Sequence, residues 1–230
     1  MTLSLEKTAQ PTLQRHNATW QDYLAFRDHL AVDCQKLAFH QGWLWVNIGK
    51  EGANHAAFSD LMTAIFFAWA FLHPEVILQS YGRCLIEHPD THACAPDLVL
   101  YQGDSIPQWQ PGEPRRIDLR QHRVPDLVGE IADTTLSLDL DEQKQLYASR
   151  GIPEYWVIDV KGCQVFAFRF TELGHYEAIA QSQVLAGLPI ALVEQTLERL
   201  STETNPAAAN WFIQQCQTLR SNCEFPLMDE

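Results

Sequence analysis

Apolar positions along the chain alternate between strand and helix periods, and the clearest unit covers residues 125–159. An apolar run at 127–131 predicts a short buried strand. A helix is predicted over 140–150, because Asp139 has an acid three residues after it, the spacing of a capping box, and a glycine follows at the end. The continuous apolar run at 155–158 is typical of a strand buried on both faces. The unit is strand, helix, strand, for which a right-handed crossover is expected.

Glu130 lies inside the apolar run of the first of these strands. Burying an unpaired carboxylate costs several kcal/mol, so an acid at this position indicates a candidate site. On the helix, Tyr147 faces the sheet, and Gln143 and Lys144 flank it on opposite sides. Either polar head is therefore expected to reach the strand that carries Glu130.

The rest of the chain is predicted from the same periods and from capping and turn residues. The expected elements are a helix over 19–31, strands over 42–48, 76–80, 83–87 and 96–101, a buried helix over 55–72, a long loop over 102–124, strands over 164–170 and 175–180, and helices over 189–200 and 205–220. Residues 1–18 are expected to be a loose arm, 19–200 one α/β domain, and 201–230 a C-terminal helical extension.

Composition supports one domain with a sizeable core, since 46% of the 230 residues are hydrophobic. The longest apolar run, 64–72, is too short to span a bilayer, and no leader pattern opens the chain, so a cytoplasmic protein without a membrane partner is expected. The six cysteines form no CxxC pair, which suits a reducing compartment.

The formal net charge of −13 disfavours tight non-specific binding to nucleic acid, because such affinity comes largely from counterion release by Lys and Arg. It leaves room for a local basic groove. Four arginines of the long loop, Arg115, Arg116, Arg120 and Arg123, are candidates for DNA contacts. The alternative is that they balance nearby acids.

A second acid, Asp97, enters a predicted strand directly after Pro96. Two carboxylates on neighbouring strands, Asp97 and Glu130, would make an oxygen-rich site for Mg²⁺ or Mn²⁺, with the backbone carbonyl of Ile131 as a third ligand. A lysine nearby would position a water or neutralise charge on a phosphate. The simpler alternative is that Asp97 only marks the start of its strand and that Glu130 is an acid facing the edge of the sheet.

Pro96-Asp97, Glu130 within LVGEIAD, and DLDEQKQLYASRGIPEYWVID at 139–159 together resemble the Uma-type putative restriction endonuclease family of bacteria, within the PD-(D/E)XK nuclease superfamily. The resemblance covers 42 to about 200 and is specific in its ordered set, which also includes His55. It implies a restriction-endonuclease-like fold, a mixed sheet flanked by helices. It also implies Mg²⁺ or Mn²⁺ on Asp97 and Glu130 and hydrolysis of DNA phosphodiester bonds by an activated water. His55 and Tyr147 are candidates to support the two acids; the alternative for His55 is a helix-start cap or a surface residue. A homodimer would suit cutting of both strands.

Two departures from the family pattern concern the lysine and an additional acid. The superfamily lysine falls at Ala132, and the helix position thought to replace it is Gln143, with Lys144 adjacent. A position where the family often has an acid falls at Ala38. The metal pair is therefore better preserved than the lysine, and a catalytically weakened or inactive binding or assembly module is the alternative function.

Cys84, His88, His92 and Cys94 offer four soft ligands within eleven residues and raise the possibility of a zinc site. Structural zinc sites usually show paired knuckles, which this stretch lacks. A β-hairpin turning after His88 explains the same residues and is the preferred interpretation.

Overall fold

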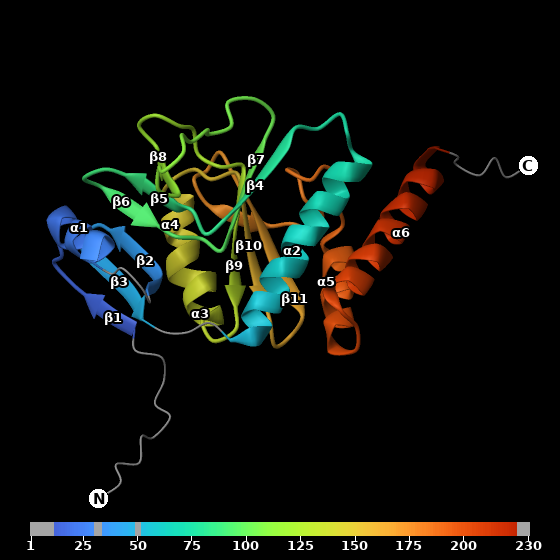
Figure 1. The fold of residues 1–230 in the computed structure, drawn as a ribbon, viewed down its shortest axis with the longest axis horizontal. Coiled ribbons are helices and arrows are strands. Elements are labelled where there is room, and N and C mark those ends of the chain that lie inside the picture. Colours follow the sequence, from blue (N-terminus) through green and yellow to red (C-terminus); the bar gives the residue numbers. More distant parts are fainter. Residues whose placement is uncertain (1–11, 30–33, 49–51, 225–230) are drawn as a thin grey trace, which may run out of the picture.

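The computed structural model describes residues 12–29, 34–48 and 52–224 (Figure 1). Two six-stranded sheets form the framework. The first sheet has the order β1 (Thr12–Arg15), β3 (Trp43–Ile48), β2 (Cys34–His40), β6 (His92–Cys94), β5 (Leu85–His88) and β8 (Arg116–Asp118). The second sheet has the order β12 (Tyr176–Ala178), β11 (Gln164–Phe170), β10 (Glu154–Asp159), β9 (Leu127–Ala132), β7 (Leu98–Gln102) and β4 (Leu78–Gly82).

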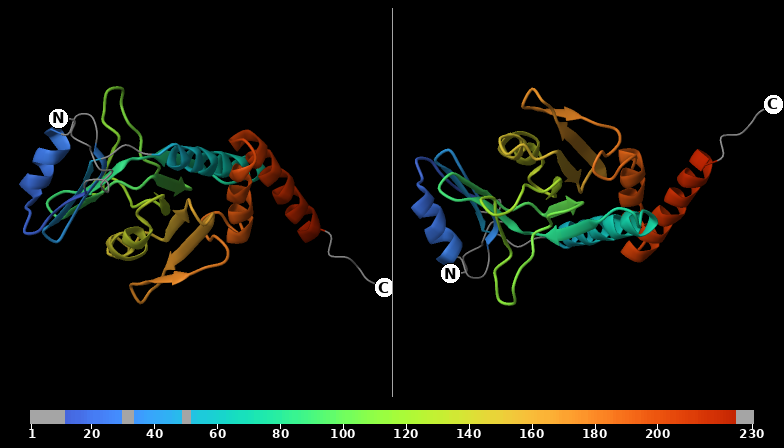
Figure 2. Two further views of the ribbon diagram at one scale, coloured as in Figure 1. Left: turned by 90° about the horizontal axis from the view of Figure 1, so that it is seen from below. Right: turned by 90° about the horizontal axis from the view of Figure 1, so that it is seen from above.

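Helices occur on both sides of the second sheet and outside the first. They are α1 (Trp20–His29), α2 (Ala53–Leu72), α3 (Leu136–Leu138), the π-helical turn η1 (Asp139–Gln143), α4 (Lys144–Ala148), α5 (Ile190–Glu198), the 3₁₀ turn η2 (Arg199–Ser201) and α6 (Asn205–Glu224). In both views of Figure 2, α1 lies at one end of the long, horizontal axis of the molecule and α6 at the other.

The strand-helix-strand unit predicted over 125–159 is confirmed. β9 and β10 pair in parallel, with Glu130 opposite Val157, and the segment α3–η1–α4 connects them. Gly151 ends the helix at φ +63°, a conformation that glycine adopts at little cost. The helix begins earlier than predicted, at Leu136, and Thr135 takes the N-cap position. The N-cap prediction for Asp139 is therefore wrong, and Asp139 lies inside the helical segment, fully buried.

Three apolar clusters divide the fold into layers. The largest packs α2, α5 and α6 against one face of the second sheet. A second fills the space between the other face of that sheet, α4 and the inner face of the first sheet. The third packs α1 on the outer face of the first sheet. The three helices α2, α5 and α6 are seen together on one side in Figure 1.

The buried helix predicted over 55–72 is α2. Among the described residues it is the one helix long and apolar enough to cross a bilayer, and half of that apolar window is buried inside the fold, as in a core helix. α6 belongs to the same cluster through Ala208, Phe212 and Cys216, so this segment of the expected C-terminal extension is part of the core.

Several strands lie elsewhere than the sequence suggested. The strands predicted at 76–80 and 83–87 form β4 and β5, which follow each other in the chain but lie in different sheets. Part of the expected N-terminal arm forms β1, which pairs with β3. β2 was not predicted, and it forms a hairpin with β3 through Gln41 and Gly42, both at positive φ as a two-residue turn of type I′ requires. The hairpin places one face of β2 against the second sheet.

Candidate active site

Asp97 and Glu130 occupy directly opposed positions on two neighbouring strands of the second sheet. β7 and β9 are antiparallel, and Leu98 pairs with Gly129, so Asp97, just before β7, continues the register opposite Glu130. Opposed residues of an antiparallel pair project from the same face. Both side chains face the layer between the two sheets, and both residues are buried, with 2% and 1% exposure.

Lys36 of β2 reaches both acids from the first sheet. Its Nζ lies 2.7 Å from Glu130 Oε2 and 3.2 Å from Asp97 Oδ2. A third carboxylate, Asp139 Oδ1, lies 3.9 Å from the same ammonium. Oxygens of Asp97 and Glu130 therefore lie close enough to contact a single cation, which is the arrangement that a shared metal site requires.

Neighbouring donors fix the two acids. The Ile131 amide donates to Asp97 Oδ2 at 2.9 Å, and His55 Nε2 lies 3.3 Å from the same oxygen. The Tyr147 hydroxyl donates to Glu130 Oε1 at 2.5 Å. His55 and Tyr147 thus contact the acids, one from the start of α2 and the other from α4.

The acids differ in how burial and charge affect their protonation. Burial opposes ionisation of Asp97, but Lys36, His55 and the Ile131 amide outweigh it, so the pKa of Asp97 is lowered. Burial raises the pKa of Glu130 to about 8; Lys36 opposes this rise, and the charges of Asp97 and Asp139 add to it. The two carboxyl groups therefore differ in how readily they ionise, and a divalent cation bound between them would favour the ionised form of both.

Asp139 and Lys36 complete the charge balance of the site. Burial raises the pKa of Asp139, whose Oδ2 accepts a hydrogen bond from Thr135 at 2.6 Å. Burial disfavours the charged form of Lys36, but the three carboxylates outweigh it and raise the pKa of Lys36 well above its ordinary value. Three buried carboxyl groups thus surround one ammonium, and the surplus of negative charge suits a divalent cation.

The backbone of Ile131 offers a further oxygen at the same edge. In a strand, the N–H and C=O of one residue point to the same side. The Ile131 N–H points to Asp97, whereas the carbonyl of the next residue, Ala132, accepts from Val160 on the opposite side. The Ile131 carbonyl therefore points toward Asp97, and the donor set fits Mg²⁺, which prefers oxygen and keeps several waters. No three Asp, Glu, His or Cys side chains of the described residues are arranged to hold a metal by themselves.

The lysine predicted on the helix lies elsewhere. Lys144 Nζ sits 3.6 Å from the ring centroid of Phe168, a residue of β11, which is separated from β9 by β10. Lys144 is thus not brought to the acids, because the turn of the helix that brings Tyr147 to Glu130 directs the flanking Lys144 along the sheet. Gln143, on the other flank, is buried and lines a pocket toward the β2–β3 hairpin.

Sequence reasoning missed Lys36 and the burial of Asp139. The available signal was a strand-like alternation over residues 36–40, in which Leu37 and Phe39 form an apolar face and Lys36 lies on the other face. Lys36 and Ala38 are two residues apart and share one face of β2, so the face that lacks the family acid at Ala38 carries a lysine.

Local structure accounts for both the zinc quartet and the loop arginines, and DNA contacts of these arginines stay a prediction. Among the described residues no zinc set is present, and the preferred hairpin is observed as β5 and β6, with His88 opposite His92. The arginines have local partners. Arg115 donates to the Gly82 carbonyl, Arg116 lies 3.4 Å from Glu87, Arg120 pairs with Asp118 at 2.9 Å, and Arg123 pairs with Asp126 at 2.7 Å.

Comparisons with known proteins agree with this architecture. Residues 20–205 match the model of the Uma2 family, described as "Putative restriction endonuclease". The fold is similar to the crystal structure of a putative nuclease belonging to DUF820 from Anabaena variabilis, with a TM-score of 0.56 and 16% identity over 78% of this chain and 98% of that chain. No curated protein matches the sequence.

Proposed function

The chain belongs to the Uma2 family of putative restriction endonucleases, and we propose that it hydrolyses phosphodiester bonds of DNA with the help of a bound Mg²⁺ or Mn²⁺. One observation carries the proposal: a single ammonium, Lys36 Nζ, contacts Asp97 Oδ2 and Glu130 Oε2 in a buried site that holds a surplus of carboxylates. Buried acids that cluster without enough counter-charge destabilise a fold, so such a cluster indicates a functional site.

Each residue of the site has a distinct role in this proposal. Asp97, Glu130 and the Ile131 carbonyl would hold the metal ion, and the ion would supply Lewis acidity and lower the pKa of a bound water. His55 and Tyr147 orient the two carboxylates through the contacts described above. Lys36 takes the part of the superfamily lysine, whose position is Ala132 in this chain, because its N–H groups can hold a water against the phosphorus and stabilise negative charge on the phosphate oxygens.

The reaction is the addition of one water across a P–O bond. The water oxygen forms the new bond to phosphorus as the bond to the departing sugar oxygen breaks, and the two products are a phosphomonoester and a hydroxyl. The proton released by the attacking water and the proton taken up by the departing oxygen balance, so no further reactant is needed.

Nicking of supercoiled plasmid tests the proposal. We expect cleavage that requires Mg²⁺ or Mn²⁺, that stops in EDTA, and that is abolished in Glu130→Ala. Asp118→Asn is a matched control, since Asp118 pairs with Arg120 away from the acids. Cleavage that survives in Glu130→Ala would assign the activity to another site or to a contaminant.

A second candidate function, a nuclease fold that acts only as a binding or assembly module, is favoured by the same ammonium. In that case Lys36 permanently replaces the metal between the acids. The two candidates predict different responses to Mn²⁺. If the protein is a nuclease, Mn²⁺ raises the melting temperature of the parent but not that of Asp97→Ala. If it is a module, Mn²⁺ raises neither melting temperature and the parent nicks no plasmid.

A further inference from the structure

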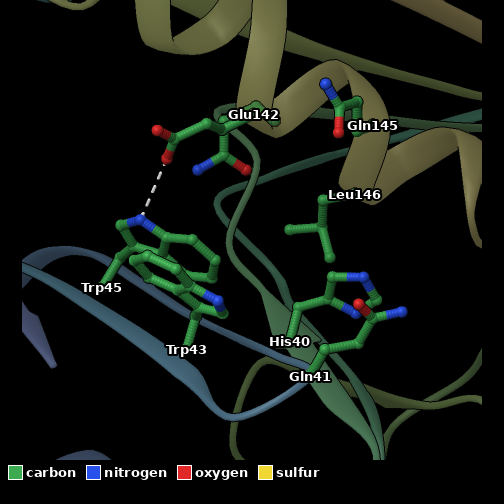
Figure 3. Close-up of a pocket in the computed structure, with 8 residues that line it drawn as sticks. His40, Gln41, Trp43, Trp45, Glu142, Gln145 and Leu146 are labelled. Atoms are coloured by element: carbon green, nitrogen blue, oxygen red, sulfur yellow. Dashed lines mark hydrogen bonds between the residues drawn. The ribbon is translucent and has the colours of Figure 1, made fainter. Parts of the chain in front are cut away.

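A pocket of about 280 Å³ lies between the β2–β3 hairpin and the helical segment η1–α4. Figure 3 shows the indoles of Trp43 and Trp45 on one side, Leu146 and Gln145 on the other, and His40 and Gln41 below. Both the hairpin and the helical segment also contribute to the candidate active site, through Lys36 and Asp139. The pocket is therefore built on the same two elements as the site.

The two indoles form a stacking platform. Trp43 and Trp45 are two residues apart on β3, and their rings stack with centroids 5.8 Å apart and planes 14° from parallel. Trp45 Nε1 donates to Glu142 Oε2 at 3.1 Å, which fixes the orientation of the inner ring. Trp43 remains 39% exposed. The His16 ring contacts the same indole, with centroids 3.5 Å apart and planes at 63°, so a flat ligand would stack on the part of the Trp43 ring that His16 leaves exposed beside the pocket.

The polar groups around the platform match the edge of a nucleobase. The amides of Gln41 and Gln145 each offer a donor and an acceptor. Arg150 Nη2 lies 2.8 Å from His40 Nδ1, and because a guanidinium has only donors, Nδ1 accepts and the neutral ring carries its proton on Nε2. Burial, and then the charge of Arg150, lower the pKa of His40, which favours this neutral form. His40 therefore offers a fixed donor for a ring nitrogen or carbonyl oxygen.

The charge at the pocket determines which part of a nucleotide enters. The Glu142 carboxylate lies on the lining and would repel a phosphate, so the group that enters is the neutral base. The phosphates would stay outside the pocket, and Arg150, hydrogen-bonded to His40, contributes a positive charge next to the lining. No ion pair joins Arg150 to a carboxylate within the described ranges 12–29, 34–48 and 52–224.

The pocket lies within a few nucleotides of the acids. Lys36 and His40 share one face of β2 and are four residues apart, which is about 13 Å at the rise of a strand. A base inside a duplex has both faces covered, so only an unpaired or flipped base could stack on Trp43. We propose that this pocket binds an unpaired base of a single-stranded DNA segment that runs across the acids. This inference rests on the proposed nuclease function and specifies its substrate class.

Stacking would also reconcile DNA binding with the acidic composition. The chain has a net charge of −13 and cannot rely on counterion release alone. Base–aromatic stacking contributes about 1–3 kcal/mol per base and does not depend on the net charge of the protein.

Single-stranded oligonucleotides that carry 2-aminopurine at successive positions test the inference, measured in EDTA so that no strand is cut. We expect the parent to quench the probe at one position, and Trp43→Ala to abolish the quenching and weaken binding by about 5- to 150-fold, the equivalent of about 1–3 kcal/mol. Trp43→Phe should retain most of both signals. Phe71→Ala is the matched control, since Phe71 is 79% exposed on α2, and it should bind as the parent does.

The possible outcomes separate this inference from the nuclease proposal. Plasmid nicking by the parent together with unchanged single-strand binding in Trp43→Ala would overturn the base pocket alone. Normal quenching without any nicking would instead overturn the nuclease proposal and leave the pocket. A folded Trp43→Ala protein, checked by its melting temperature, is required in each comparison, and Trp43→Leu replaces it if the alanine variant is unstable.

Discussion

Replacing Lys36 with methionine removes the ammonium that contacts both acids and keeps a flexible side chain of similar length. The lysine side chain is only 16% exposed, and its partners Asp97 and Glu130 are almost fully buried. Removing one partner of a buried ion pair costs about 3–5 kcal/mol, because it leaves uncompensated charge. For a chain of this size each kcal/mol lowers the melting temperature by about 2–4 °C, so we expect a decrease of about 6–20 °C in EDTA.

A divalent cation should reverse much of this loss. Without the ammonium, the carboxyl groups of Asp97, Glu130 and Asp139 have more to gain from a metal ion, so Mn²⁺ should raise the melting temperature of Lys36→Met more than that of the parent. At a Mn²⁺ concentration 100 times the Kd, the stabilisation is about 2.7 kcal/mol. Thermal melts with and without Mn²⁺ measure both quantities.

Plasmid nicking by the same variant separates a catalytic lysine from one that only balances charge. Loss of one positioned donor at a transition state typically lowers the rate about 10²- to 10³-fold, and we expect a decrease of that order in Lys36→Met even with Mn²⁺ bound. Lys144→Met is the matched control, since its ammonium lies over the Phe168 ring, and its rate should be unchanged. The reasoning is refuted if Lys144→Met loses nicking while Lys36→Met retains it.

Three further predictions concern Glu130, Tyr147 and Arg120. Because burial raises the pKa of Glu130 from 4.5 to about 8, the folded parent holds a proton between these values that the unfolded chain releases; this contribution to stability is lost as pH rises through 8. In thermal melts in EDTA, the melting temperature of the parent should therefore fall relative to that of Glu130→Gln as the pH rises from 6 to 9. A constant difference between the two melting temperatures would contradict the pKa shift. Tyr147→Phe removes a buried donor to Glu130 and should lower the free energy of unfolding by about 1–3 kcal/mol in urea titrations; an unchanged midpoint would disprove the contact. Arg120→Ala breaks an exposed pair with Asp118, so stability should change by less than about 1 kcal/mol and DNA affinity, measured by anisotropy, should stay the same; a large loss would identify a phosphate contact.

Local patterns were sufficient for the central unit of the fold. The apolar runs of β9 and β10 and the glycine at 151 all lie within about thirty residues, and the structure has the predicted strand, helix and strand. At the start of α1, Thr19 and Asp22 have the spacing of a capping box, and two reciprocal hydrogen bonds join them in the structure. Such features depend on near neighbours in the chain, which is why sequence alone identifies them.

The division into two sheets could not be predicted in the same way. β4 and β5 are separated by two residues yet belong to different sheets, because each pairs with a strand distant in the sequence. Lys36 meets Glu130 across 94 residues, and no spacing rule relates them. Asp139 was misassigned because an acid with another acid three residues later also fits a capping box, and only the tertiary structure shows that its side chain is buried beside Lys36. The resemblance identified Asp97 and Glu130 as metal-ligand candidates, but it did not identify Lys36 as their counter-charge.

The central claim is that Asp97 and Glu130 share one divalent cation, and a Mn²⁺ titration followed by electron paramagnetic resonance tests it most directly. The account predicts one bound Mn²⁺ per chain in the parent, and binding at least about tenfold weaker in both Asp97→Asn and Glu130→Gln, with Asp118→Asn as an unaffected control. Parental affinity in both variants, or a loss in only one of them, would contradict a shared ion.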